Sequence, residues 1–243
     1  MKKKIRISFP LVLAALGWLY TICKGVGYLR WQIPSILPML LYSAVFSALF
    51  TLLACLVQKG KMRQSTSVLL FFGTLPVQLF ALFFVSMFAA VEPTSNPAAY
   101  EYVLHELNYP RNKTIAFFPE EIPEGAQDVS FWHNYPFLQG GERLSLAFTA
   151  DEEYISSEID RLSGEAKWTG THSDSKGLNN GVSFQSFESM DGESYTLSDD
   201  CTVYLLYSRP YMDSGDHIWN HGETCVVVIS DEKNRILYQM DDW

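Results

Sequence analysis

Acidic residues are missing from the first 91 positions of this 243-residue chain. All 27 Asp and Glu residues lie in 92–243, whereas the 18 Lys and Arg residues divide equally between the two parts. The first part therefore carries a charge of +9 and the second a charge of −18, because its 27 acids outnumber nine bases. This division excludes a single soluble globule, and the negative second part repels nucleic acid. Aromatic residues, at 14% of the chain, exclude a disordered polymer.

Catalytic signatures are also missing. The sequence contains no G-x-S-x-G, no S-x-x-K, no phosphate-binding loop and no C-x-x-C pair. These absences favour a protein that is not an enzyme and that needs no cofactor.

Three long apolar runs occupy the first part and carry no charge. They cover residues 7–23, 33–57 and 67–91. A helix needs roughly 20 residues to cross a membrane, and Lys24 can extend its charged end to the headgroups beyond the short first run. We therefore predict three transmembrane helices over about 7–29, 33–57 and 67–91, which together anchor the chain in the lipid bilayer. A cleaved signal peptide is the alternative interpretation of the first run, but the sequence has no small-x-small cleavage site after it.

The distribution of Lys and Arg between the loops predicts the orientation. Residues 2–6 and 59–63 hold seven basic residues, against two in 24–32. Because cytoplasmic flanks carry the excess of positive charge, the N-terminus is expected in the cytoplasm and residues 92–243 outside it. The cytoplasmic membrane is thus the expected location. An inverted topology is the alternative, since the charge rule has exceptions.

The second and third runs hold no ionisable residue, which argues against a transport pathway. Small residues gather on one face of the second run, where they allow another helix to approach closely. They are Ala44, Ser47, Ala48 and Thr51. Packing against the chain's own helices is the favoured interpretation, and docking of another membrane protein is the alternative.

Residues 92–243 begin with a linker over 92–97. Asn96 and Pro97 are suited to start a helix, and apolar residues between 100 and 107 recur at helical spacing. Alternation predicts strands over 127–133 and 142–148, which we expect to form a hairpin. A second helix is predicted after a capping box of Thr149 and Glu152, with Gly164 as its C-terminal stop.

The rest of the chain is typical of strands. The runs cover 182–188, 201–208, 224–230 and 235–240, and turn residues separate them. The predicted fold is therefore a membrane α part with three transmembrane helices, joined to an α+β, mainly antiparallel-sheet extracytoplasmic domain over 92–243.

Two residue pairs suggest a disulfide or a metal site. Cys201 and Cys225 would lie where a disulfide is permitted, but as the starts of neighbouring antiparallel strands they would be roughly 20 Å apart. A bridge therefore requires parallel or non-adjacent strands. His217 and His221 have suitable metal-ligating groups, yet they lack H-E-x-x-H spacing, so a polar loop is favoured.

Aromatic and polar residues around the first hairpin loop are the candidate binding residues. They are Trp132, His133, Tyr135, Phe137 and Gln139. Alternatively, these side chains only pack the tip of the hairpin.

One segment of the chain suggests a relationship. It contains Phe118-Pro119, Ile122-Pro123 and the run Phe137-Leu138-Gln139-Gly140-Gly141, followed by Leu144 and Leu146. This pattern resembles one in uncharacterised membrane-anchored proteins of Gram-positive bacteria. The resemblance implies a bacterial envelope protein and assigns no catalytic residue.

These observations favour an envelope protein whose extracytoplasmic domain binds a partner, such as another envelope or membrane protein, or a ligand. A metal-assisted hydrolase using His217 and His221 is one alternative. A subunit of a multi-component membrane complex, docked through the small-residue face of the second helix, is another.

Overall fold

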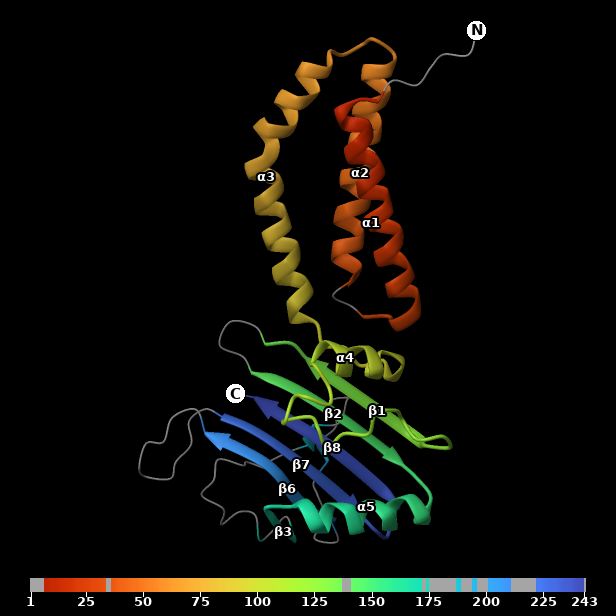
Figure 1. Ribbon diagram of the computed structural model, residues 1–243, viewed down its shortest axis with the longest axis vertical. Coiled ribbons are helices and arrows are strands. Elements are labelled where there is room, and N and C mark those ends of the chain that lie inside the picture. Colours follow the sequence, from red (N-terminus) through yellow and green to blue (C-terminus); the bar gives the residue numbers. More distant parts are fainter. Residues whose placement is uncertain are drawn as a thin grey trace. The chain divides into compact units, whose positions relative to one another are not determined.

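A computed structural model describes residues 7–33, 36–136, 141–171, 174, 187–188, 194–195, 201–210 and 222–242. The chain divides into two compact units, Met1–Glu92 and Pro93–Trp243. Their elements are labelled in Figure 1.

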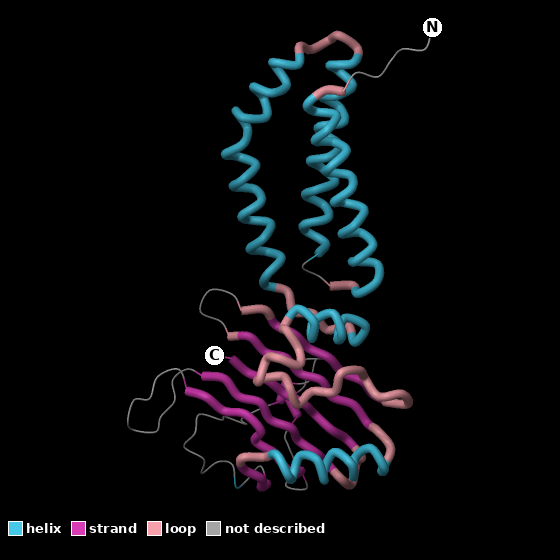
Figure 2. Tube along the Cα trace, viewed as in Figure 1, coloured by secondary structure: helices cyan, strands magenta, loops and turns pink. Residues whose placement is uncertain are grey.

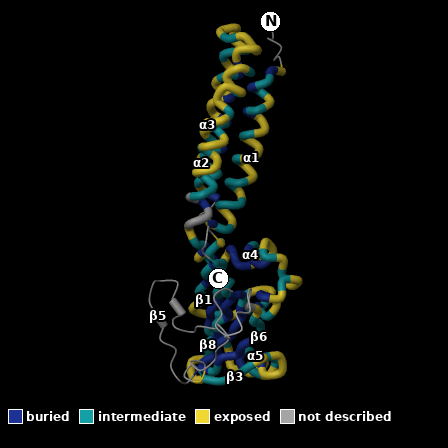
Figure 3. The backbone as a smooth tube through the Cα atoms, turned by 90° about the vertical axis from the view of Figure 1, so that its left-hand side faces the viewer, coloured by how far each residue is buried: buried dark blue, intermediate teal, exposed yellow. Residues whose placement is uncertain are grey.

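The first unit consists of three long helices in its described part. They are α1 (Phe9–Trp31), α2 (Ile36–Gln58) and α3 (Gln64–Val91). All three are long and apolar enough, by length and composition, to cross a membrane, and the three predicted long apolar helices are therefore present. Exposed residues extend along these helices, as Figure 3 shows, and many are large apolar side chains. Lipid is the environment in which such surfaces are stable.

Helices α1 and α2 approach each other closely at small and hydroxyl residues. A Cβ atom at Gly17 would overlap Ser47 Oγ, so a larger residue there would require Ser47 to move. Thr21 Oγ1 donates a hydrogen bond to Ser43 Oγ at 3.0 Å, and the buried Ser47 donates to its own helix at Ser43 O. Every one of these hydroxyls therefore has a partner, as an apolar solvent requires.

The second unit contains an antiparallel sheet, which has six strands within the described residues. They are β1 (Gln127–Asn134), β2 (Glu142–Thr149), β3 (Trp168–Thr171), β6 (Cys201–Pro210), β7 (Gly222–Ser230) and β8 (Arg235–Asp242). Their order across the sheet is β1-β2-β8-β7-β6-β3, so the last strand lies between β2 and β7. The predicted β1–β2 hairpin and an antiparallel sheet are confirmed. The strand predicted over 182–188 lies outside the described residues, except for Phe187–Glu188, which form β4 and pair with β5 (Ser194–Tyr195).

Two short helices lie against one face of this sheet. A 3-10 turn (Pro97–Ala99) leads into α4 (Tyr100–Glu106), and Asn96 accepts the amide hydrogen of Ala98 as its predicted cap. Figure 2 shows the described segment between α4 and β1 as a loop, and Figure 1 places α5 (Glu152–Glu165) across the strands. The rings of Tyr100 and Phe131 meet edge to face at 5.7 Å, so α4 covers β1.

The ends of α5 differ from the prediction. Asp151, not Thr149, accepts the amide hydrogen of Tyr154 at 2.8 Å and caps the helix. Thr149 instead pairs with Arg235 in the sheet, because β2 continues to that residue. The helix also runs through Gly164 and ends at Glu165.

Apolar side chains lie on both faces of the central strands. Phe148, Tyr238 and Ile229 are fully buried on the face that α5 covers. Strand alternation sends Val203, Val226 and Val228 to the other face, where they form a separate buried cluster. Burial on both faces explains why β7 is an almost continuous apolar run rather than an alternating one.

Candidate functional site

His133 is the centre of a polar cluster on the covered face of β1. The residue is completely buried, and its Nε2 lies 2.9 Å from Glu142 Oε1 on β2. Its other ring nitrogen, Nδ1, has no hydrogen-bond partner among the described residues. Strand pairing explains the contact with Glu142, because His133 lies opposite Leu144, and Glu142 is the next residue on the same face of β2.

The segment that follows α3 closes the outer edge of β1 beside this histidine. Thr94 N donates to His133 O and His133 N donates to Thr94 O, both at 2.8 Å. Thr94 is completely buried, and it is the second residue after Glu92, the C-cap of α3. The linker predicted over 92–97 is therefore partly an additional bridge on the sheet.

Tyr135 covers the histidine and is hydrogen-bonded to Glu106 of α4. The ring of Tyr135 lies 4.3 Å from the imidazole, centroid to centroid, and its Oη donates to Glu106 Oε2 at 3.1 Å. Tyr102 donates to the other oxygen of the same carboxylate. We call Tyr102, Glu106, His133, Tyr135 and Glu142 the His133 cluster.

Both phenols of the His133 cluster are held in their protonated form. Burial, and then the hydrogen bond and negative charge of Glu106, raise the pKa of Tyr102 to about 12. Burial and the charge of Glu106 also raise the pKa of Tyr135. The two hydroxyls therefore act as donors at neutral pH, and the Glu106 carboxylate accepts from both.

A histidine oriented by a carboxylate is an arrangement found in acid–base catalysis. Here the imidazole is completely buried, and Tyr135 lies against it. A substrate cannot reach His133 in this arrangement. The hydrogen bonds of the His133 cluster instead join α4, β1 and β2. Glu106 is exposed, and Tyr102 and Tyr135 are half-buried.

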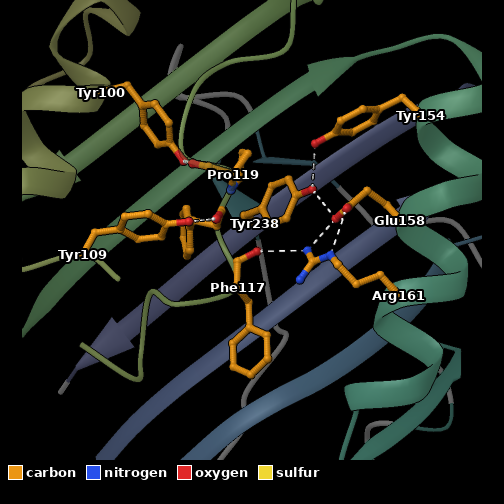
Figure 4. Close-up of polar contacts among 9 residues, drawn as sticks. Tyr100, Tyr109, Phe117, Pro119, Tyr154, Glu158, Arg161 and Tyr238 are labelled. Carbon is orange, nitrogen blue, oxygen red and sulfur yellow. Dashed lines mark hydrogen bonds and ion pairs between the residues drawn. The ribbon is translucent and has the colours of Figure 1, made fainter. Parts of the chain in front are cut away.

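A second polar network connects α5 with β8 and with the loop over 115–119 (Figure 4). Glu158 accepts hydrogen bonds from Arg161 Nε at 2.9 Å, from Arg161 Nη2 at 2.6 Å and from Tyr238 Oη at 2.7 Å. The hydrogen bonds and charge of Glu158 raise the pKa of Arg161, so the guanidinium group stays charged.

The same network satisfies three consecutive backbone carbonyls. Phe117 O accepts from Arg161 Nη2 at 3.1 Å, Phe118 O from Tyr109 Oη at 3.1 Å, and Pro119 O from Tyr100 Oη at 2.5 Å. The loop has no helix or strand partner, so side chains supply the donors that its carbonyls need. This network therefore has a structural role.

The candidate binding residues around the hairpin are not all brought together. Trp132 pairs with Ser145, and strand alternation places it on the opposite face from His133, so its inclusion in one site with His133 is wrong. Tyr135 does contact His133. Phe137 and Gln139 lie outside the described residues, as do His217 and His221.

The disulfide considered from the sequence is excluded by the strand register. Cys201 lies opposite Ser230, whereas Cys225 is five residues away on that same strand, β7. Five residues span about 16 Å, and a disulfide needs Cα atoms within about 7 Å. Burial also raises the pKa of the Cys225 thiol.

The small-residue face of α2 is divided between two environments. Ser47 lies against Gly17, and Thr51 Oγ1 accepts a hydrogen bond from Trp18 Nε1 at 3.0 Å, so both contact α1. Ala44 is half-buried and Ala48 is exposed.

Four residues of this region are not predicted from the sequence: Glu106, Tyr102, Glu142 and Thr94. The spacing of Tyr102 and Glu106, four residues apart on a predicted helix, was a usable signal. Glu142 and Thr94 depend on strand pairing, for which the local sequence contains no signal.

Comparison with protein-family models, with curated proteins and with solved structures gave no match. Function is therefore inferred from the sequence and geometry of this chain.

Proposed function

We propose that this chain is a multi-pass membrane protein of a bacterial envelope whose acidic sheet domain binds a partner protein or a ligand outside the cytoplasm. The observation that carries the proposal is the division of the chain into an apolar, purely basic three-helix unit and an acidic domain with its own core. The shortest of the three helices has 23 residues, or about 35 Å, which is enough for a ~30 Å hydrocarbon core.

The orientation follows from charge. Lys59, Lys61 and Arg63 all lie in the α2–α3 loop, and four more basic residues precede α1 in the sequence. Lys24 and Arg30 are the basic residues at the other end of α1. The greater positive charge favours a cytoplasmic α2–α3 loop and residues 92–243 outside the cytoplasm.

Cysteine labelling in intact cells tests this orientation. Glu153→Cys on α5 and Lys61→Cys in the α2–α3 loop are both at exposed positions. A membrane-impermeant maleimide is expected to label the first variant in intact cells and the second only after permeabilisation. The chain without an added cysteine is the control. The reverse pattern would contradict the proposed orientation.

Binding rather than catalysis is favoured by the complete burial of His133, whose imidazole is oriented by Glu142. The surface above it presents a carboxylate between two phenols, and tyrosine is enriched at protein interfaces. We therefore assign the partner-binding surface to Tyr102, Glu106 and Tyr135.

Site-specific photo-crosslinking tests this surface. A photoreactive amino acid replaces Pro136, which is exposed next to Tyr135, and in a matched control it replaces Ser156, which is exposed on α5. A discrete adduct at position 136 that is lost in a Glu106→Gln variant is the expected result. Equal adducts at both positions, or none at position 136, would contradict the assigned surface.

A further inference from the structure

A half-open cavity of about 1270 Å³ lies between the helices of the three-helix unit. Its wall combines the first half of α1, the C-terminal end of α2, the loop that follows α2 and the first residue of α3. The cavity extends from Ser8 to Trp18, a distance of about 15 Å along the helix, which matches the depth of one leaflet of a ~30 Å core. Its volume exceeds the ~300–1,000 Å³ of typical small-molecule pockets.

The lining has two chemically different parts. Toward the middle of α1 the lining is apolar, with Leu11, Ala14 and Ala54. The hydrogen bond between Trp18 and Thr51 lies at the end of the cavity that is farthest from Ser8. The near end contains Ser8 and Lys59 together with two glutamine side chains. An apolar channel with a polar, cationic end matches an amphiphile, not a purely apolar or purely polar molecule.

Ser8 lies at the polar end with an unused hydroxyl. The residue is 3% exposed, and its Oγ has no hydrogen-bond partner among the described residues. Ser8 is the N-cap of α1, but its side chain does not cap the helix. The positive end of the α1 dipole therefore lies beside the buried Ser8 hydroxyl, which has no acceptor among the described residues. This combination favours an anion.

The electrostatic surroundings of the cavity are uniformly positive. Lys59 lines it, and Lys61 and Arg63 follow in the same loop. Residues 1–91 contain no acid to neutralise these basic residues. A negative headgroup would meet no repelling carboxylate from this unit.

We propose that this cavity binds an anionic phospholipid from the leaflet on the basic side of the membrane. The phosphate lies near Ser8 and Lys59, and an acyl chain lies along the apolar wall formed by α1 and α2. A soluble phosphate would satisfy the polar end but would leave the apolar wall without a partner. This inference rests on the membrane-spanning part of the proposed function.

Native mass spectrometry of the delipidated full-length chain in detergent tests the proposal. The protein is titrated with phosphatidylglycerol and with phosphatidylcholine of the same acyl chains. One tightly retained phosphatidylglycerol is expected, with an apparent Kd at least about tenfold below that of phosphatidylcholine. Inorganic phosphate at millimolar concentration is added as a competitor and should not displace the lipid.

Two variants and two matched controls locate the site. Lys59→Gln should weaken phosphatidylglycerol about five- to tenfold and leave phosphatidylcholine unchanged, whereas Ala15→Leu should weaken both lipids by filling the cavity. Lys24→Gln removes an equal charge near the opposite end of α1, and Ala48→Leu adds equal bulk at an exposed position away from the cavity. Both controls should bind like the unmodified chain.

Three results would overturn the proposal. Equal retention of the two lipids would remove the anionic selectivity, and equal binding by all four variants would mean that the lipid sits elsewhere on the helices. Displacement by inorganic phosphate would make the ligand a soluble anion. Failure of the membrane topology itself would appear in the cysteine-labelling pattern, which is independent of lipid retention.

Discussion

Removal of one hydroxyl group should measure how strongly the network in Figure 4 holds α5 to the sheet. Tyr238 is completely buried, and its Oη donates to Glu158 at 2.7 Å. Tyr238→Phe deletes this hydrogen bond, together with the longer 3.3 Å hydrogen bond between Tyr238 Oη and Tyr154 Oη, and keeps the ring. A hydrogen bond to a charged group contributes about 1.5–3 kcal/mol. Glu158 keeps its two hydrogen bonds from Arg161, so its charge remains paired, and we expect a loss of about 1.5 kcal/mol, the lower end of this range.

Hydrogen–deuterium exchange of the full-length protein in lipid nanodiscs provides the assay. Amides of β8 that exchange through unfolding of the domain should exchange about tenfold faster in Tyr238→Phe, because 1.4 kcal/mol corresponds to a factor of ten. Tyr109→Phe is the matched control. It removes a longer, 3.1 Å bond to a neutral carbonyl and should cost only about 0.5–1 kcal/mol.

The comparison of the two variants can refute the reasoning. If Tyr238→Phe accelerates exchange no more than Tyr109→Phe does, the carboxylate does not strengthen the buried hydrogen bond. If only the peptides of α5 respond and β8 does not, the network holds the helix locally and contributes nothing to the stability of the sheet.

Three further predictions concern other parts of the molecule. The pKa of Tyr135 is raised in the folded domain, so stability should fall as the pH rises above about 10, with a shallower slope in Tyr135→Phe when denaturation is followed between pH 9 and 11. Gly17→Val should lower the thermal stability of the detergent-solubilised protein by about 1–3 kcal/mol, whereas Gly73→Val, which has open space around its Cβ, should cost less. In the native protein, a maleimide should label Cys225 at least about tenfold more slowly than after denaturation, and an oxidant should not link it to Cys201. Rapid labelling of Cys225 would contradict its burial, and a 201–225 disulfide would contradict the strand register.

The sequence alone was sufficient to predict the helices of the first unit and the positions of most strands in the second unit. Long apolar runs predict helices because a backbone in lipid must satisfy its hydrogen bonds internally, and that requirement is local. The α3 helix illustrates this: it was predicted over 67–91 and is observed over Gln64–Val91. The β1 and β2 strands were likewise predictable from alternation, since each face repeats every second residue.

Only the tertiary structure decided which strands are neighbours and which polar groups meet. The strand β8 pairs with β2, although about 85 residues separate them in the chain, and no local pattern specifies that choice. The same pairing determines the composition of the His133 cluster, because Glu142 approaches His133 only through the β1–β2 register, and Thr94 only through an edge bridge. Alternation also separated Trp132 from His133, although the two are adjacent in sequence. Local patterns establish that a strand exists, whereas the burial of apolar surface shared by distant segments selects its partner.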